Sequence, residues 1–369
     1  MKLPFQPPIQ PMLAKLTSGI PEGDSYIFEP KWDGFRALVF RDGDNVQIQS
    51  RDLKPLQRYF PELAAPLRAQ LPERCVLDGE IVIAHNGVLD FEALLQRIHP
   101  AESRVKMLSE QWPASYVAFD MLALADEDLR THPQKDRRTH LEAALGRATP
   151  PVFMTPATRD RALALDWFNR FEGAGLDGVV AKDESLVYSP GKRTMIKIKH
   201  ERTVDCVVGG FRWYKDGKGE LIGSLLLGLY DGEGKLQHVG ICASFNRERR
   251  KALCEELAPL RENAREGHPW AKWNEESTTT AGDASRKPGM KSRWSKGKDL
   301  SWEALRVERV CEVSFDHMQG RRFRHATHFK RWRPDKPTRE CTYAQLDVTP
   351  AFEVTKIFGA KGTQVNQIK

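Results

Sequence analysis

Lys31 is the residue of this sequence whose surroundings best suit covalent chemistry. It follows the apolar run 26–28 and precedes the turn signal Asp33-Gly34, within the segment KWDGFR. A lysine fixed at the end of a strand near other charges can act as a neutral nucleophile once it loses its proton. Arg36, in the same segment, carries a guanidinium that suits a phosphate or a sugar hydroxyl. Taken alone, the pattern also fits a solvent-exposed lysine before a turn.

Other charged residues stand within apolar stretches, where an unpaired charge would be costly to bury. Glu80 lies in VLDGEIVI, Asp120 ends YVAFD, and Asp177 precedes GVVAK. Lys197 and Lys199 alternate with isoleucines, so both side chains face one side of the expected strand. Two lysines on one strand face suit a polyphosphate, and two or three carboxylates beside them suit Mg²⁺. Each carboxylate alone is also consistent with a surface or turn position, but their recurrence at strand after strand favours a shared site.

The elements that must position these residues alternate between short strands and helices over the first 200 residues. Residues 37–40 and 46–48 flank Asp42-Gly43-Asp44 and predict a hairpin. Residues 91–98 carry apolar side chains at helical spacing, and Pro100 follows them. Further strands are expected at 76–83, 115–120, 179–181 and 195–199, and a further helix at 161–171.

The pattern changes at about residue 203. Short strands with one helix and a long loop follow, which predicts a small β-barrel such as an OB-fold. The charge changes at the same place: residues 1–200 hold 26 basic and 27 acidic side chains, whereas residues 201–369 hold 31 and 23. The basic excess of the second half points to a polyanion such as nucleic acid. The expected strands are 205–211, 221–230, 236–242 and 309–315, the helix is 248–260 and the loop is 269–301.

The composition excludes several classes of protein. A chain of 369 residues with 40% hydrophobic and 29% charged residues has material for more than one folded domain. The six cysteines form no CxxC or CxxH pair, which argues against structural zinc and against a disulfide framework. No apolar run approaches the roughly 18 residues of a membrane span, and the N-terminus lacks a secretory pattern. We therefore expect a cytoplasmic protein with no membrane partner.

Two groups of cations in the second half are candidates for binding DNA phosphates. The first falls in a stretch without acidic residues between 286 and 298, and the second is interleaved with aromatic residues at 323, 329 and 332. Cations on phosphates give salt-dependent affinity that does not depend on sequence. A solvated loop face is the alternative for the first group. The DNA-binding candidates are Arg286, Lys287, Lys291, Arg293, Arg321 and Arg322.

The order of motifs in the chain resembles that of a known family. KWDGFR, SRD, LDGEIV, FDML, DGVVAK, IKIK and RWRPDK follow one another between about residues 11 and 346. This series resembles the ATP-dependent DNA ligases of the covalent nucleotidyltransferase superfamily. Because no polymerase or phosphoesterase domain is added, the chain looks most like a compact bacterial ligase of the C type.

The resemblance implies roles for the residues that match these motifs. Lys31 matches the lysine that attacks the α-phosphorus of ATP, which releases pyrophosphate and leaves a lysyl-AMP. Glu29 stands where the family has a residue whose backbone reads adenine, and Phe119 matches the aromatic residue that stacks on adenine. Arg36 and Arg51 match arginines that hold the ribose and the phosphates or the nick end.

The remaining matches concern the phosphates and the metal. Glu80 matches the carboxylate near the ribose and metal. Lys197 and Lys199 match the pair on the α-phosphate and leaving group. The motif RWRPDK supplies Arg331, Asp335 and Lys336, which match residues that orient pyrophosphate during the first step. The resemblance therefore implies ATP and Mg²⁺ or Mn²⁺ as cofactors.

Two positions depart from the family pattern. The family usually has Glu before the glycine of its fourth motif, where this chain has Asp177. We expect Asp177 to be a metal ligand, with water bridging what the longer Glu would reach directly. Glu172-Gly173 is a rival match upstream, although the residues VVAK after Gly178 favour Asp177. Asp52 stands where Asn is common.

These observations predict an α+β protein with three parts. Residues 1–202 are expected to form a nucleotidyltransferase (adenylation) domain of antiparallel sheets and helices. Residues 203–350 are expected to form a β-barrel OB-fold domain, and residues 351–369 a tail without order.

The expected activity is the sealing of 5′-phosphate/3′-hydroxyl nicks in duplex DNA during repair. We expect a monomer that acts on nicked duplex DNA, and a Ku-like end-binding protein or another repair protein is a further candidate partner. An RNA ligase or guanylyltransferase of the same superfamily and a catalytically silent nucleic-acid-binding protein are the alternatives.

Overall fold

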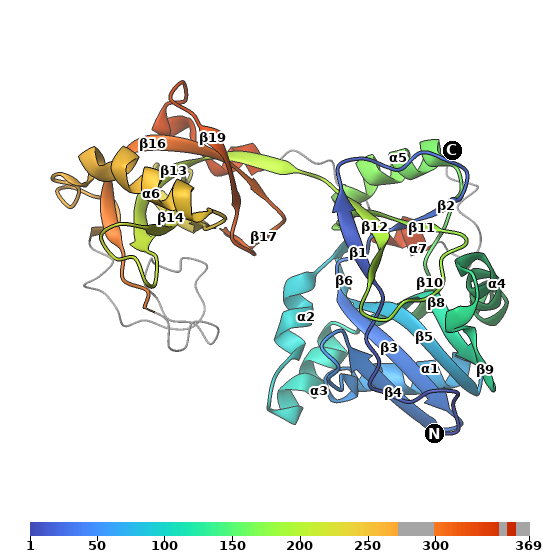
Figure 1. The fold of residues 1–369 in the computed structure, drawn as a ribbon. Coiled ribbons are helices and arrows are strands. Elements are labelled where there is room, and N and C mark those ends of the chain that lie inside the picture. The colour runs from blue at the N-terminus through green and yellow to red at the C-terminus, as the bar shows by residue number, and fades with distance from the viewer. Residues whose placement is uncertain (272–298, 347–352, 359–369) are drawn as a thin grey trace. The chain divides into compact units, whose positions relative to one another are not determined.

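The computed structural model describes residues 1–271, 299–346 and 353–358 (Figure 1). The chain divides into two compact units, and the division falls between His200 and Glu201. The described residues 353–358 belong to the first unit, although they follow the second unit in the sequence. None of the helices in the described ranges has the length and apolar character that a membrane crossing requires.

Two mixed sheets form the framework of the first unit. One has the strand order β10-β8-β5-β3-β4 with β9 paired to β8, and the other has the order β1-β12-β11-β2. The hairpin expected around residue 43 is confirmed as β3 and β4, and the strand expected at 76–83 is confirmed as β5. The strands are β1 Leu13–Thr17, β2 Tyr26–Pro30, β3 Phe35–Asp42, β4 Asn45–Ser50, β5 Arg74–Val82, β8 Ser115–Leu124, β9 Glu127–Asp128, β10 Val152–Met154, β11 Gly178–Asp183 and β12 Arg193–Lys199.

The prediction of antiparallel sheets is wrong at two pairings. Strand β1 runs parallel to β12, and β10 runs parallel to β8. The helix α4 (Gln134–Leu145) connects β8 to β10. Parallel strands need such a crossover connection, and the segment through α4 is long enough to provide it.

Two helices of the first unit begin at aspartate caps. Asp90 accepts a hydrogen bond from the Ala93 N–H at the start of α2 (Phe91–Arg97), and Asp160 does the same for two amides of α5 (Arg161–Phe171). Both helices lie where the sequence predicts them. The other helices of this unit are α1 Ala64–Gln70, α3 Glu102–Gln111 and α7 Val354–Phe358, with the short hairpin β6 Ala84–His85 and β7 Val88–Leu89, and the 3₁₀ turns are Gln57–Tyr59, Pro61–Leu63, Leu129–Thr131 and Glu172–Ala174.

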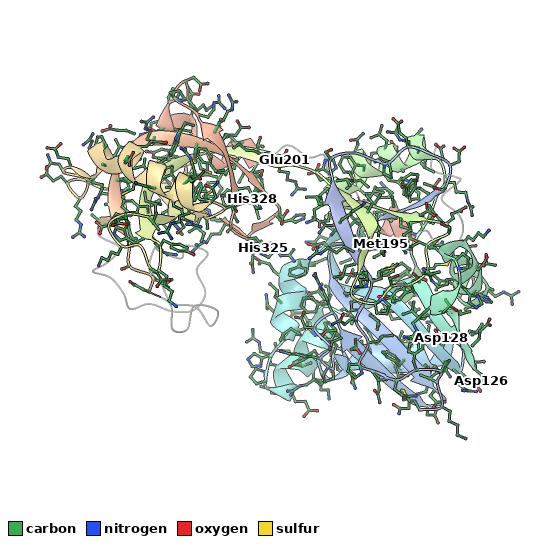
Figure 2. The ribbon with its side chains drawn as sticks, viewed as in Figure 1. Asp126, Asp128, Met195, Glu201, His325 and His328 are labelled. Atoms are coloured by element: carbon green, nitrogen blue, oxygen red, sulfur yellow. The ribbon has the colours of Figure 1, made fainter. Side chains whose placement is uncertain are left out.

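The two sheets of the first unit share a buried cluster. Met195 of β12, labelled in Figure 2, is buried together with Leu38 and Phe40 of β3. Since β12 and β3 belong to different sheets, this cluster joins one sheet to the other. The sheets therefore form one framework for the side chains at their strand ends.

The second unit contains an antiparallel sheet of the order β15-β14-β13-β16-β19. The expected barrel is not closed among the described residues, because no ladder joins β15 to β19. A single bridge between Cys242 and Thr327 brings the two edges together instead. The elements are β13 Arg202–Trp213, β14 Ile222–Tyr230, β15 Leu236–Cys242, α6 Arg247–Leu257, β16 Glu303–Phe315, β17 Met318–Gln319, β18 Arg322–Phe323 and β19 His328–Trp332, with 3₁₀ turns at Ala258–Arg261, Thr338–Glu340 and Tyr343–Leu346.

Part of the C-terminal tail is ordered, in contrast to the expectation for residues 351–369. Residues 354–358 form the helix α7, and Val354 and Ile357 are buried in the core of the first unit. Two apolar residues three positions apart lie on one face of a helix, so even a short helix can bury both.

Candidate active site

Lys31 lies in the connection that leaves β2, beside the start of β11. The Lys31 N–H donates to the Gly178 carbonyl at 2.9 Å, and the Asp177 N–H donates to the Lys31 carbonyl at 3.0 Å. Gly178 has a φ of +132°, and a Cβ there would lie 2.0 Å from the Ile198 carbonyl oxygen. Only glycine fits this close approach of β11 to β12. The Asp-Gly pair of DGVVAK thus sets the backbone of position 177 against that of the lysine.

One carboxylate joins two of the expected lysines. The Asp177 carboxylate forms ion pairs with the Lys31 and Lys199 ammonium groups, the latter at 2.8 Å. Lys197 stands on the same strand, and burial together with the nearby Lys199 and Lys31 lowers its pKa. Three ammonium groups with one carboxylate give a positive site that suits a polyphosphate.

Glu80 and Arg36 are neighbours on the large sheet. They are directly paired in the register of β3 with β5. Burial raises the pKa of Glu80 to about 7, against the opposite influence of Arg36 and Lys31. Gly34 permits this arrangement, because a Cβ at that position would lie 2.2 Å from the Ile81 carbonyl oxygen and 2.8 Å from the Glu80 side chain.

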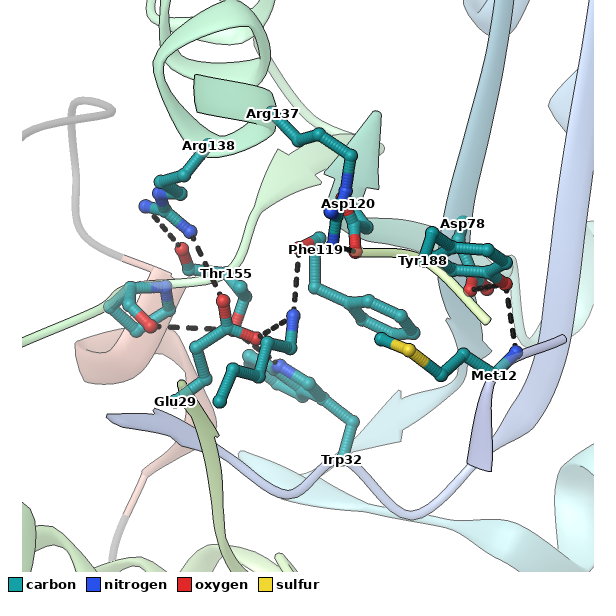
Figure 3. A network of polar contacts seen from close by, with 12 residues as sticks. Met12, Glu29, Trp32, Asp78, Phe119, Asp120, Arg137, Arg138, Thr155 and Tyr188 are labelled. Carbon is teal, nitrogen blue, oxygen red and sulfur yellow. Dashed lines mark hydrogen bonds and ion pairs between the residues drawn. The ribbon is translucent and has the colours of Figure 1, made fainter. Parts of the chain in front are cut away.

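A fully buried carboxylate holds Arg36. Asp78 accepts two hydrogen bonds of 2.5 Å from the Arg36 guanidinium and one of 2.6 Å from the Tyr188 hydroxyl. The Tyr188 oxygen accepts in turn from the Met12 N–H at 3.0 Å, as Figure 3 shows. The guanidinium carbon of Arg36 lies 4.4 Å from the centre of the Phe119 ring. Arg36 and Phe119 are therefore brought together, as two parts of one site require.

Phe119 stands at an irregularity of the ladder between β5 and β8. Asp78 pairs with Asp120 and Gly79 with Ala118, so Phe119 is the extra residue. Such a bulge turns a side chain away from its regular direction. The Lys182 ammonium donates to the Phe119 carbonyl at 2.9 Å, which fixes the backbone at the bulge.

Glu29 is buried in a network of polar side chains (Figure 3). Its carboxylate pairs with the Lys182 ammonium at 2.7 Å and lies 3.6 Å from the Arg138 guanidinium. Arg138 also donates to the Thr155 carbonyl at 3.1 Å, and Thr155 accepts from the Trp32 indole at 2.9 Å. The network thus connects β2, β11 and α4, and it includes Glu29 and Trp32, which stand before and after Lys31 in the sequence.

Three residues of this site were missed by the sequence reasoning. Lys182 and Asp78 lie inside the motifs DGVVAK and LDGEIV, and a charge enclosed by apolar residues was the available signal. Tyr188 gave no such signal, since it stands 110 positions from Asp78.

Glu80 and Asp177 are the carboxylates that could hold a metal ion. The described residues contain no group of three or more His, Cys, Asp or Glu side chains suited to a metal. Mg²⁺ is usually held by one or two carboxylates together with substrate phosphates and water, so this donor set fits such an ion. The rival Glu172 lies in the 3₁₀ turn after α5, 4.0 Å from the His200 ring nitrogen.

The remaining candidates lie elsewhere. Arg51 is exposed and follows β4 directly. Arg321 lies 5.0 Å from the Tyr343 ring, and Arg322 begins β18, both in the second unit. His325 and His328, labelled in Figure 2, follow them in the sequence. The candidates Arg286, Lys287, Lys291 and Arg293 lie outside the described residues.

The RWRPDK motif lies in the second unit and is held by its central arginine. Arg333 makes two hydrogen bonds to Asp205, at 2.9 and 3.0 Å, and also pairs with Asp335. The Arg333 guanidinium lowers the pKa of Asp335 to about 2. Arg331 pairs with Glu312 at 2.7 Å, and Lys336 pairs with Glu340 at 3.1 Å.

Comparison with known proteins identifies the family. Residues 11–199 match the family described as "ATP dependent DNA ligase domain", and residues 218–336 match "ATP dependent DNA ligase C terminal region". The chain belongs to the ATP-dependent DNA ligases. This confirms the resemblance seen in the motifs.

Several relatives of this DNA ligase are similar over nearly their whole length. DNA ligase C2 of Mycolicibacterium smegmatis is 53% identical, over 95% of this chain and 97% of the relative. DNA ligase C of Mycobacterium tuberculosis is also 53% identical, over 94% and 96%. A solved structure from work on Lig E DNA ligases is 16% identical with a TM-score of 0.50, covers 87% of this chain and 99% of that one, and supports the fold alone. Because the chain belongs to the ATP-dependent DNA ligases, it uses ATP together with a divalent metal ion.

Proposed function

We propose that this ligase seals 5′-phosphate/3′-hydroxyl nicks in duplex DNA through a lysyl-AMP and then an adenylated DNA, as part of DNA repair. The observation that carries the proposal is the meeting of Lys31, Lys199 and Asp177 at the ends of β2, β12 and β11. A nucleophile surrounded by further cations is what nucleotidyl transfer requires, because the protein must mainly position the groups and offset charge on the phosphates.

In the first step, the Lys31 amine attacks the α-phosphorus of ATP. A P–N bond forms, the bond from the α-phosphorus to the bridging oxygen breaks, and pyrophosphate leaves. The Lys31 ammonium must first release a proton to solvent before it attacks, and Asp177, which contacts the ammonium, holds Lys31 in place beforehand. Lys197 and Lys199 offset charge on the α-phosphate and the leaving group. Mg²⁺ or Mn²⁺ held by Glu80 and Asp177 supplies further charge neutralisation when bound.

The adenosine of ATP occupies the neighbouring part of the site. The Phe119 ring stacks on adenine, and the backbone of Glu29 reads its edge. Arg36 holds the ribose or the phosphates, and Arg51 contacts the phosphates or the nick end. The networks around Asp78 and Lys182 support this assignment, because they fix Arg36 and the Phe119 backbone.

We assign the first unit, residues 1–200 with 353–358, to the nucleotidyltransferase domain expected at 1–202, and the second unit to the OB-fold domain expected at 203–350. The second domain brings Arg331, Asp335 and Lys336 to orient pyrophosphate during the first step. DNA phosphates then bind its basic residues, which include Arg286, Lys287, Lys291, Arg293, Arg321 and Arg322.

Lys31→Ala tests the assignment of the nucleophile. The purified variant is incubated with α-³²P-ATP and divalent metal, and nicked DNA is then added. We expect no labelled protein and no sealing, whereas binding of nicked DNA stays within a few fold of the parent. Lys15→Ala, at an exposed lysine of β1, is the matched control and should label normally. A Lys31→Ala protein that still becomes labelled refutes the assignment. Label from GTP, or label discharged only on RNA nicks, points instead to a guanylyltransferase or an RNA ligase.

A further inference from the structure

The chain returns to its first unit after completing the second. Residues 353–358 dock on the first unit, where the Val354 N–H donates to the Gly87 carbonyl at 2.6 Å. Gly87 forms the turn between β6 and β7, and the Glu353 side chain lies beside it. Figure 1 shows α7 in red among the elements of the first unit. The helix is therefore an integral part of a unit whose other residues end at His200.

Val354 and Ile357 join one particular core cluster. Val354 is fully buried and Ile357 is 2% exposed, and both belong to the cluster that contains Trp32 and Ile198. Trp32 is the neighbour of Lys31, and Ile198 stands between Lys197 and Lys199. Successive residues of a strand point to opposite faces of the sheet. The cluster thus lies on the face of the four-stranded sheet opposite to Lys197 and Lys199.

The same alternation holds on the neighbouring strands. Val179 and Ala181 of β11 and Phe28 of β2 belong to this cluster. Lys182, which follows Ala181, and Glu29, which follows Phe28, instead carry the polar network. Strands β2, β11 and β12 therefore each rest on this cluster with one face and present charged side chains on the other. A protein core is packed so densely that a void shifts its neighbours instead of leaving them in place.

We propose that α7 is a positioning element for the lysine nucleophile. By filling the core under Trp32 and Ile198, Val354 and Ile357 fix the backbone that carries Lys31 and Lys199. The C-terminal segment thereby contributes to adenylation without touching ATP. The role of Lys31 in this inference rests on the proposed function.

Ile357→Ala in the full-length enzyme is the test. Two quantities are measured with α-³²P-ATP: the rate of lysine adenylation at saturating ATP, and the KM for ATP. Small displacements of reacting groups are costly, so we expect the rate to fall about ten- to a hundredfold. The KM should stay within about twofold, because Arg36 lies on β3, which contributes no residue to this cluster, and is fixed by Asp78. Ile357→Leu should restore the rate.

Two controls separate positioning from stability. Leu67→Ala removes a fully buried leucine from α1, whose cluster contains neither Trp32 nor Ile198, and should lower the melting temperature without changing the rate per folded molecule. Lys356→Ala, at an exposed position of α7, should change neither quantity. If Ile357→Ala does not fold, Ile357→Val makes a smaller void and should lower the rate by a smaller factor.

The possible results are distinct. An Ile357→Ala rate per folded molecule equal to that of the parent overturns the inference, and so does a raised KM at unchanged rate. If the parent enzyme is not labelled at Lys31 at all, the proposed function fails first.

Discussion

Replacing Tyr188 by phenylalanine removes one hydroxyl from the buried network that holds Arg36. The hydroxyl donates to the Asp78 carboxylate at 2.6 Å and accepts from the Met12 N–H at 3.0 Å. Tyr188 is 4% exposed and Asp78 is fully buried, so water does not replace these bonds readily. A hydrogen bond to a charged group contributes about 1.5–3 kcal/mol, and an unsatisfied buried N–H adds a further penalty. We expect Tyr188→Phe to lower the free energy of unfolding by about 2–4 kcal/mol.

Equilibrium urea unfolding of the full chain measures this loss, with each resolved transition fitted separately. Tyr26→Phe is the matched control, since no hydrogen bond of the Tyr26 hydroxyl is found among the described residues. Tyr188→Phe should also raise the KM for ATP in the adenylation assay, because the Asp78 carboxylate that holds Arg36 then lacks the hydrogen bond from the Tyr188 hydroxyl. A loss below about 0.5 kcal/mol relative to the control, which is the range of an ordinary surface substitution, would refute this reasoning.

Two other predictions concern charged groups. Burial raises the pKa of Glu80 from 4.5 to about 7, so the native protein keeps a proton that the unfolded chain has released. The free energy of unfolding of the metal-free enzyme should therefore fall by up to about 3 kcal/mol as the pH rises from about 4.5 to 7. Thermal melting in the presence of a chelator measures this fall, and Glu80→Gln should remove it. Arg333→Lys loses the paired hydrogen bonds to Asp205 and should destabilise the second unit by about 1–2 kcal/mol in urea unfolding. Lys336→Gln should change the free energy of unfolding by less than about 0.5 kcal/mol, because its ion pair with Glu340 lies at the surface.

Local patterns were sufficient for most elements of the first unit. The spacing of apolar residues, with Pro100 after them, placed α2, and the turn at Gly43 placed the hairpin of β3 and β4. The helix expected at 161–171 was found as α5. The parallel pairings could not be read in this way. Strand β1 pairs with β12 some 180 residues later in the chain, and no local signal records which distant strand covers an edge.

The same limit applies to the buried partners of the site. The sequence identified Glu29 and Arg36 through their motif, but their counterions Lys182 and Asp78 come from other strands. The sequence of α7 is short and lacks strong periodicity, so its burial depends on a cavity that the first 200 residues create. Such contacts follow from tertiary structure and have no local signature.

Asp177 illustrates how local and tertiary information combine at this site. The motif alone left two carboxylates, Asp177 and Glu172, as matches to the acidic position of the family's fourth motif, and they stand five positions apart. Pairing of β11 with β2 joins Val179 to Pro30, which sets residue 177 beside Lys31 and allows the two hydrogen bonds between their backbones. Because the backbones are already in contact, the short Asp side chain reaches the lysine ammonium, and the additional methylene of Glu is not needed. The strand pairing therefore selects the carboxylate, and the glycine that follows permits that pairing.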